Sequence, residues 1–322
     1  MTHRVAFFRV LVVLVPMAVC AQTVQTALLT QLLQRHEFTQ ALETATLLHK
    51  QVPDDLTIRA YLADAYIELG DYEEAVKTTQ ALMNLRPGNP LGLTRAGRLR
   101  ELHGDNAGAL ELLHRAYEVT SPQEVSDRVS LLTRMARLQL HSGSVAEAET
   151  LVNTALGTTP DEPEAIGVLA QVRQAQHRND EAIALLEKRF ALERRAGNLF
   201  TLAQALDTAG QKQGAAKAFA DFEQKALDES DRAANANHEL ADYYVDYAHR
   251  PTQALEVASR ELRRRHDVFT LDAYAWSLAA CGDYVQASLE IHKALAFGSK
   301  DPVILRHASE IAAHLDGQDW SR

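Results

Sequence analysis

The stretch LTIRAYLADAYIELGDYEEAVKTTQALMNLRPGN, residues 56–89, determines how this chain folds. Its apolar residues, among them Leu62 and Tyr66, recur every three or four positions, which predicts a helix with one apolar face. Gly70 comes next, and glycine readily takes the left-handed conformation that closes a helix. A second helix is predicted to follow and to end before Pro87, because proline cannot continue a helix. The stretch therefore predicts two consecutive helices joined by a tight turn.

The same pattern recurs along the chain at a period near 34 residues. Its marker is an alanine in the second helix, with successive spacings of 34, 34, 39, 34, 33, 39 and 33 residues. These alanines are Ala41, Ala75, Ala109, Ala148, Ala182, Ala215, Ala254 and Ala287. A period of this length indicates one supersecondary unit stacked many times. We interpret the alanines as small side chains that let the two helices of a unit approach closely.

Each of these alanines lies five residues after a glycine or a histidine. Five units have glycine there, and the other three have His36, His177 and His249. Histidine is among the residues other than glycine that are enriched at positive φ. We therefore interpret these histidines as turn residues rather than metal ligands, since they belong to three separated units.

Residues 56–89 resemble the tetratricopeptide repeat, an antiparallel pair of helices 34 residues long. The matching positions are Leu62, Ala63, Tyr66, Ala75 and Pro87, while Arg59 stands where the family often has tryptophan. The resemblance implies an all-α fold, a right-handed α-α superhelix (solenoid) of about eight helical hairpins with a capping helix at about 302–316. The predicted units are 22–55, 56–89, 90–123, 129–162, 163–195, 196–229, 235–267 and 268–301, within one solenoid domain, 22–322. A HEAT-type solenoid is the alternative, but its period of roughly 40–47 residues fits less well.

The chain departs from the regular period in two places. Insertions of five residues near 124–128 and 230–234 are expected to lengthen a loop or to add a helical turn. The match also weakens from about residue 163, where other residues replace the closing proline of most early units. The sequence therefore defines the later unit boundaries less well.

The first 21 residues read as a secretory signal peptide. His3 and Arg4 precede the apolar residues 10–19, and small residues lead to a predicted cleavage after Ala21. The apolar run is shorter than the roughly 20 residues that span a bilayer. We expect an exported protein, periplasmic or secreted, with a retained N-terminal membrane anchor as the alternative.

Cys20 permits a further alternative. The tetrapeptide Met17-Ala18-Val19-Cys20 resembles a lipobox, which would leave a lipidated Cys20, although Val19 stands where a small residue is usual. After removal of the signal peptide, Cys281 is the remaining cysteine of the chain. No intramolecular disulfide is then possible, and packing alone must hold the scaffold.

Charge and motif content exclude several functions. The formal net charge is -10, which disfavours sequence-independent binding to nucleic acid. The sequence has no HExxH, no glycine-rich phosphate loop and no GxSxG. Two cysteines are too few for a zinc cluster. We therefore expect no enzymatic activity, no cofactor and no bound metal.

The resemblance implies that the first helix of each unit lines a concave face that binds ligand. At the corresponding positions, the third and fourth units carry Arg95, Arg98, Arg134 and Arg137. The members of each pair are three residues apart, so they share one helical face. We predict that these guanidiniums bind a carboxylate or an acidic peptide. The alternative is that they pair with neighbouring acids such as Glu101 or are simply solvated.

A second candidate surface lies in the last two units. Tyr243, Asp246, Tyr247 and Trp276 fall at first-helix groove positions. Tyrosine and tryptophan are enriched in binding hot spots, which makes these residues candidates for contact with a partner. Aromatic residues at helical spacing also occur in cores, and that alternative stays open.

The leading hypothesis is an exported, non-enzymatic scaffold of the cell envelope that holds a protein or extended peptide in its concave groove. The arginines favour an acidic partner. No contact with nucleic acid is expected, and contact with a membrane is expected only through the N-terminal segment. The alternatives are a self-associating structural spacer, an assembly lipoprotein and, more remotely, an unrecognised enzyme.

Overall fold

The computed structural model describes residues 25–316, and within this part all regular secondary structure is helical. Residues 25–34 form the first helix. The helices that follow are α2 (Phe38–Gln51), α3 (Leu56–Leu69), α4 (Tyr72–Leu85), α5 (Pro90–Leu102), α6 (Asn106–Val119), α7 (Val125–His141), α8 (Val145–Thr158), α9 (Pro163–Ala175), α10 (Asn179–Leu192), α11 (Ala196–Thr208), α12 (Lys212–Glu229), α13 (Asn237–Asp242), α14 (Pro251–Leu262), α15 (Val268–Ala280), α16 (Tyr284–Ala296) and α17 (Pro302–Asp316). One π-helical turn, η1 (Tyr243–Tyr247), continues α13. The predicted signal peptide and Cys20 lie outside the described residues.

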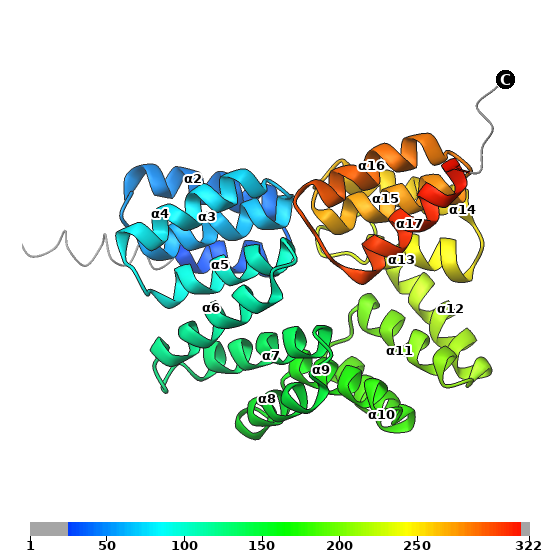
Figure 1. Cartoon of the computed structure of the whole chain (residues 1–322), viewed down its shortest axis with the longest axis horizontal. Coiled ribbons are helices and arrows are strands. Elements are labelled where there is room, and N and C mark those ends of the chain that lie inside the picture. The colour runs from blue at the N-terminus through cyan, green and yellow to red at the C-terminus, as the bar shows by residue number, and fades with distance from the viewer. Residues whose placement is uncertain (1–24, 317–322) are drawn as a thin grey trace, which may run out of the picture.

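Consecutive helices pack in pairs, and each pair packs against the next (Figure 1). The stretch 56–89 forms α3 and α4, joined at Gly70 as predicted from its sequence. The pairing then repeats through α15 and α16, and α17 follows as a single helix. The predicted all-α solenoid of helical hairpins is confirmed.

Short polar residues set where several first helices begin. The Asp55 carboxylate accepts hydrogen bonds from the backbone N–H groups of Thr57 (2.8 Å) and Ile58 (3.0 Å) at the start of α3. Asn89 and Asp267 do the same before α5 and α15. Such caps satisfy amides that have no partner inside the helix. At α3, α5 and α15 the local sequence therefore fixes where the first helix of the unit starts.

The turns inside the units have the left-handed geometry that the sequence predicts. Gly70 has a φ of 87°, and the three histidines at the equivalent positions, His36, His177 and His249, have φ values of 58°, 59° and 53°. These are the described residues other than glycine with positive φ. The interpretation of the histidines as turn residues is therefore confirmed.

The marker alanines lie where paired helices touch. Each of the eight is at most 1% exposed. A larger side chain at such a position would force the helices apart or strain them, because protein interiors are densely packed. The spacing of the alanines therefore marks the positions at which the two helices of each unit are in contact.

The two insertions have different structural results. The first lengthens α7, which starts at Val125, four residues before the predicted unit boundary. The second follows α12, which runs to Glu229, and residues 230–236 form a non-helical segment before α13. Both outcomes lie within the alternatives that the sequence left open.

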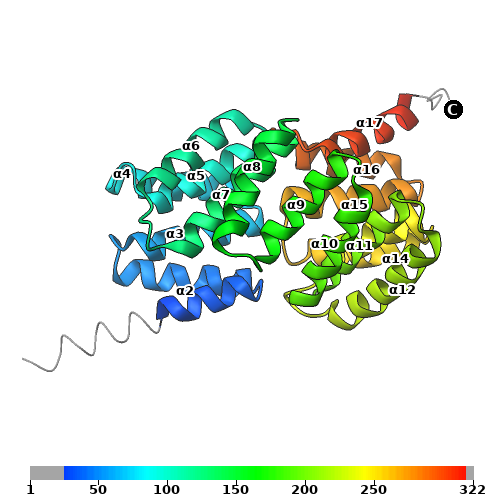
Figure 2. The same ribbon diagram turned by 90° about the horizontal axis from the view of Figure 1, so that it is seen from below.

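The solenoid closes on itself, which the sequence analysis did not anticipate. The turns at 69–72 and 102–104 lie against the loops at 266–268 and 297–300, so early repeats touch late ones (Figures 1 and 2). We call this contact the seam. Across it, the backbone N–H of His266 donates to the Leu69 carbonyl at 2.9 Å. The Tyr72 hydroxyl accepts from the backbone N–H of Val268 at 3.0 Å, and the Tyr72 ring stacks on Phe297 with centroids 4.4 Å apart.

Gly70 is needed at the seam for a second reason besides its φ. A Cβ atom there would lie 2.5 Å from the backbone nitrogen of Asp267. A Cβ at Gly104 would lie 2.6 Å from Cγ of the Lys300 side chain, whereas one at Gly143 would meet nothing within 4 Å. Of these three positions, Gly70 therefore requires glycine most strictly, because a Cβ atom there would clash with backbone atoms across the seam.

Helix α17 covers the end of the last pair, as predicted for a capping helix. It packs on α16 and α15 through Ile304, His307 and Ile311, each at most 1% exposed. Nδ1 of His307 lies 3.0 Å from both carboxylate oxygens of Asp272 in α15, and Asp272 is 2% exposed. The cap thus buries a polar pair as well as apolar side chains.

Candidate functional site

The four predicted arginines line one cavity of about 790 Å³ in the inner wall. Arg95 and Arg98 project from α5, and Arg134 and Arg137 from α7. The length of α3, the start of α5 and the segment from Thr120 into the start of α7 complete the lining. Successive first helices thus bring together arginines that are almost forty residues apart in sequence. We call this space the groove cavity.

Each of these arginines has an acidic partner within the chain. Nε of Arg95 donates to Asp64 at 2.9 Å, and this pair joins α5 to α3. Arg98 and Arg134 share the carboxylate of Glu101, at 3.2 Å and 3.5 Å. The pairing with Glu101 that the alternative interpretation expected is therefore present.

The next unit repeats the shared arrangement. Arg137 donates to Glu164 at 2.7 Å, and Arg189 of α10 donates to the other oxygen of the same carboxylate at 2.8 Å. In both clusters two guanidiniums contact one carboxylate, which leaves one positive charge in excess. The ion pairs thus order the arginines without neutralising them.

The pKa values reflect this crowding of positive charge. Burial, together with the neighbouring charge of Arg98, lowers the pKa of Arg134 to about 10. Burial pushes the pKa of Glu101 upward, but Arg98 and Arg134 hold it below its ordinary value. An anion placed beside Arg134 would relieve the repulsion between the guanidiniums. The geometry and the charge both fit an acidic group at this position.

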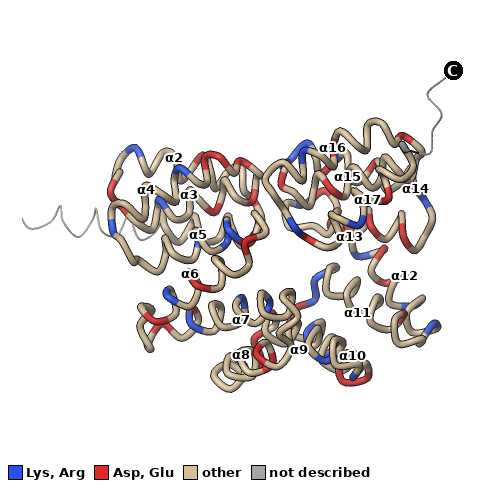
Figure 3. The backbone as a smooth tube through the Cα atoms, in the orientation of Figure 1, with Lys and Arg blue, Asp and Glu red and all other residues tan. Residues whose placement is uncertain are grey.

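Acidic residues also line the groove cavity. Glu124 and Asp127 lie at the start of α7, and Glu68 lies at the end of α3. Figure 3 shows that the positions of Lys and Arg and those of Asp and Glu are interleaved along the helices. Four arginines and four carboxylates line the cavity, so the excess of positive charge is confined to the clusters in which two guanidiniums share one carboxylate.

Tyr243 and Tyr247 pack against the core of the preceding unit. The Tyr247 ring lies 4.5 Å from Phe219 and meets Phe200 edge-on at 6.1 Å, while Tyr243 stacks on Phe219 at 5.3 Å. Both tyrosines belong to the π-helical turn η1. Their packing favours the core interpretation that the sequence left open.

Asp246 and Trp276 form a contact of their own. Nε1 of Trp276 donates to Asp246 at 2.9 Å, and the indole stacks on the ring of His307 with centroids 4.2 Å apart. Trp276 is half-buried under α17, while Asp246 is exposed. Asp246 is thus the most accessible of the four residues predicted for this surface, and their role in binding stays a prediction.

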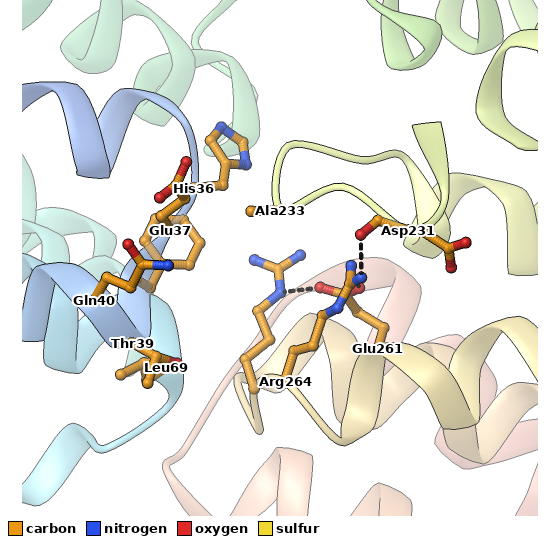
Figure 4. Close-up of a pocket in the computed structure, with 11 residues that line it drawn as sticks. His36, Glu37, Thr39, Gln40, Leu69, Asp231, Ala233, Glu261 and Arg264 are labelled. Carbon is orange, nitrogen blue, oxygen red and sulfur yellow. Dashed lines mark hydrogen bonds and ion pairs between the residues drawn. The ribbon is translucent and has the colours of Figure 1, made fainter. Parts of the chain in front are cut away.

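A pocket of about 260 Å³ lies beside the tight part of the seam, between the first turn and the end of α14 (Figure 4). His36 lies on one side, and Glu261 and Arg264 on the other. The buried Glu261 accepts from Nε of Arg265 at 2.9 Å, and Arg264 donates to the backbone oxygen of Asp231 at 2.9 Å. These side chains hold the inserted segment in place, so we assign the pocket's arginines a structural role.

The described residues provide no metal centre: between 25 and 316, no three His, Cys, Asp or Glu side chains are placed so that they could hold an ion. Likewise, none of the described helices is long and apolar enough to cross a membrane.

Comparison with known families matches the early repeats. The family model described as tetratricopeptide repeat fits residues 32–94 and 102–172. These two segments are similar to tetratricopeptide repeats. The tetratricopeptide match ends near the point where the regular sequence pattern weakens, whereas the helix pairs continue to α16. It includes Arg134 and Arg137, while Arg95 and Arg98 lie between the two matched segments. None of the curated proteins compared with the chain matches it in sequence.

Solved structures with the same tetratricopeptide-type architecture are similar over most of the chain. Cut9 in its complex with Hcn1 is 12% identical over 88% of this chain, with a TM-score of 0.54, and this chain spans about half (48%) of Cut9. Human IFIT1, solved as a dimer with m7Gppp-AAAA, is 14% identical over 83% of this chain and 69% of its own, with a TM-score of 0.57. PilW, a type IV pilus biogenesis factor, is 16% identical over 63% of this chain and 93% of its own, with a TM-score of 0.52. At these identities the likeness shows the fold alone.

Sequence reasoning located the arginines but missed part of their setting. Glu164, which holds Arg137, and Glu68, at the edge of the cavity, were not singled out. Both lie on first helices, at positions that the repeat pattern places on the concave face. Listing the acidic residues at those positions together with the arginines would have identified both.

Proposed function

We propose that this protein binds a protein or extended peptide in the groove cavity and does not act as an enzyme. Tetratricopeptide repeats generally mediate protein–protein interaction, and the fold is typically a non-enzymatic scaffold. The observation that carries the proposal is the sharing of Glu101 by Arg98 and Arg134 within the cavity. It supports a partner that brings an acidic group to α5 and α7.

The arrangement suits recognition better than catalysis. The guanidiniums are already ordered by their ion pairs, so little side-chain entropy is lost when a carboxylate binds. Charge-assisted hydrogen bonds of this kind contribute about 1.5–3 kcal/mol each. An extended segment lying across α3, α5 and α7 would contact the three first helices in succession.

The double variant Arg134→Gln/Arg137→Gln tests the proposal. A photo-crosslinker at Ser130, which lines the groove cavity, would first identify the partner, and calorimetry would then measure its affinity. We expect the double variant to bind about a hundredfold more weakly, since two charge-assisted contacts are lost.

Arg178→Gln is the matched control. Arg178 is exposed, pairs with Glu181 and does not line the groove cavity, so its loss should leave affinity within twofold, as is usual for surface ion pairs. Equal affinities for all three proteins would show that the partner does not use the arginine clusters.

We also propose that the protein is exported to the cell envelope. The basic start, the short apolar run and the small residues before Gln22 support this. The intact mass of protein purified from its native compartment is expected to match a chain beginning at Gln22. A mass that includes residues 1–21 would contradict export with cleavage, and a lipid adduct on Cys20 would identify a lipoprotein instead.

A further inference from the structure

The positive charge of the groove cavity is concentrated in two clusters. In one, two guanidiniums share Glu101, and in the other two guanidiniums share Glu164. Helix α7 contributes one arginine to each cluster, Arg134 to the first and Arg137 to the second, with side chains 23% and 32% exposed. Each cluster keeps one uncompensated positive charge, so the cavity presents two such charges, and a guanidinium of α7 is accessible at both.

The two arginines that α5 contributes to the cavity have more of their charge compensated. Arg95 donates to Asp64 through both Nε and Nη2, so this pair is neutral. Arg98 has the Glu68 carboxylate of α3 nearby, in addition to the carboxylate that it shares. An incoming anion is therefore attracted most strongly to the α7 side of the cavity.

The spacing of the two arginines on α7 limits what can contact both. Residues three apart on one helical face, as Arg134 and Arg137 are, have Cβ atoms about 5–6 Å apart. In an extended segment, successive side chains point to opposite sides, and those two positions apart lie on the same side at about 7 Å. The long guanidinium side chains can span the small difference. Side chains two positions apart in an extended segment therefore match the two arginines, whereas adjacent side chains do not.

The lining changes toward the start of α7. Leu91 of α5 and Leu131 of α7 are apolar, and Glu124 and Asp127 are acidic. Asp127 precedes Arg134 by seven residues, which is about 10 Å along the helix. Further acidic residues of a partner would be repelled there, because like charges placed opposite each other disfavour binding. A short acidic pair next to neutral or apolar residues therefore fits the cavity better than a long acidic tract.

We propose that the partner segment carries two acidic side chains separated by one residue, one for each arginine of α7. This proposal rests on the proposed function and specifies the chemistry of its acidic partner. The two uncompensated charges belong to separate clusters, so two single carboxylates complement them better than one doubly charged group such as a phosphate does. Each carboxylate would accept charge-assisted hydrogen bonds from one guanidinium of α7.

Short synthetic peptides test the spacing. They are acetylated and amidated, so that neither end adds a charge, and contain only glycine and serine around the residues compared. Titrations of the full chain compare Asp-Ser-Asp with Asp-Asp-Ser, with two aspartates separated by several serines, with one phosphoserine and with Asn-Ser-Asn. We expect Asp-Ser-Asp to bind about tenfold more tightly than either rearranged aspartate peptide, since each of those makes only one of the two contacts.

Single variants of the protein assign the contacts. In Arg134→Gln and in Arg137→Gln the shared carboxylate keeps its second arginine, so neither variant leaves a buried charge unpaired. Replacing either aspartate of Asp-Ser-Asp by asparagine should weaken binding to the native protein about tenfold. One of these replacements should have no effect in Arg137→Gln, and the other should have none in Arg134→Gln. Arg178→Gln, which lies outside the cavity, is the matched control and should bind every peptide as the native protein does.

The outcomes separate this proposal from the proposed function. Equal affinities for the three aspartate peptides would overturn the spacing but leave an acidic partner in place. Tighter binding of the phosphoserine peptide than of Asp-Ser-Asp would also overturn it, in favour of one doubly charged group. If no acidic peptide binds more tightly than Asn-Ser-Asn, the acidic partner of the proposed function is overturned together with the spacing.

Discussion

Gly70→Ala is expected to lower the free energy of unfolding by about 3 kcal/mol, a large effect for a single methyl group. Part of this loss is local, since a residue with a side chain at a φ of 87° carries strain of about 1–2 kcal/mol. The rest comes from the seam, where the new Cβ would lie 2.5 Å from the Asp267 backbone nitrogen. Backbone cannot move aside as a flexible side chain can, so the seam must open.

The same substitution in other units separates the two contributions. Gly143→Ala has the same strain, at a φ of 81°, but meets nothing within 4 Å, so it should cost only about 1–2 kcal/mol. The new Cβ of Gly104→Ala would lie 2.6 Å from Cγ and 2.8 Å from Cβ of Lys300; rotation of the side chain can move Cγ but not Cβ, so its cost should fall between those of the other two variants. Urea unfolding of the three variants measures these differences. Equal losses at Gly70 and Gly143 would mean that the seam contributes nothing to stability.

This comparison bears on how the solenoid unfolds. In an open repeat array each unit contacts only its neighbours, so stability is a sum of local contributions. The seam couples the second and third units to the seventh and eighth. Breaking it should therefore also separate the unfolding of the two ends, which hydrogen exchange along the chain would reveal.

His307→Ala is expected to cost about 3–5 kcal/mol, because it leaves a buried carboxylate without its partner. Arg306 can only donate, so its contact with Nε2 of His307 at 3.0 Å makes Nε2 the acceptor. Nδ1 therefore carries the proton and donates to Asp272. Thermal or urea unfolding would measure this loss of stability, which we expect to arise from weaker attachment of α17 to α15.

Two further variants test this explanation. His314→Ala removes another ring of α17, which stacks on Tyr284 at 4.3 Å but is exposed, and should cost about 1 kcal/mol. The double variant Asp272→Ala/His307→Ala also removes the carboxylate that His307→Ala leaves buried and unpaired. It should therefore be more stable than His307→Ala alone. If the double variant is instead the less stable of the two, the cost lies in lost packing and not in an unpaired carboxylate.

Local patterns predicted the repeat unit in detail. Gly70 and the three turn histidines predicted the left-handed turns, and the alanine period predicted where paired helices make contact. These features depend on residues close together in sequence, whose sterics and spacing act in every unit. The same periodicity placed the four groove arginines on neighbouring helices, because equivalent positions of adjacent units face the same side.

The setting of the arginines was less predictable. The bridges from Glu101 to Arg134 and from Glu164 to Arg189 depend on which long side chains meet across two helices. The rotamers of arginine and glutamate depend on burial and on neighbouring charges. A repeat pattern in the sequence gives information on neither. The packing of the η1 tyrosines on Phe219 likewise depends on contacts between helices that the repeat pattern does not record.

The chain sequence by itself determined the helical hairpin, its turn and the number of its copies. Only the tertiary structure decided that the array closes into a ring. The tripeptide Gly-Asp-Tyr occurs at 70–72 and again at 282–284, yet Gly70 lies against backbone in the seam while Gly282 has open space around it. Closure depends on the small rotation between each unit and the next, summed over the repeats that separate the two ends. The sequence of one repeat does not determine this total rotation. Identical residues therefore have different contacts in different repeats, depending on which part of the ring they face.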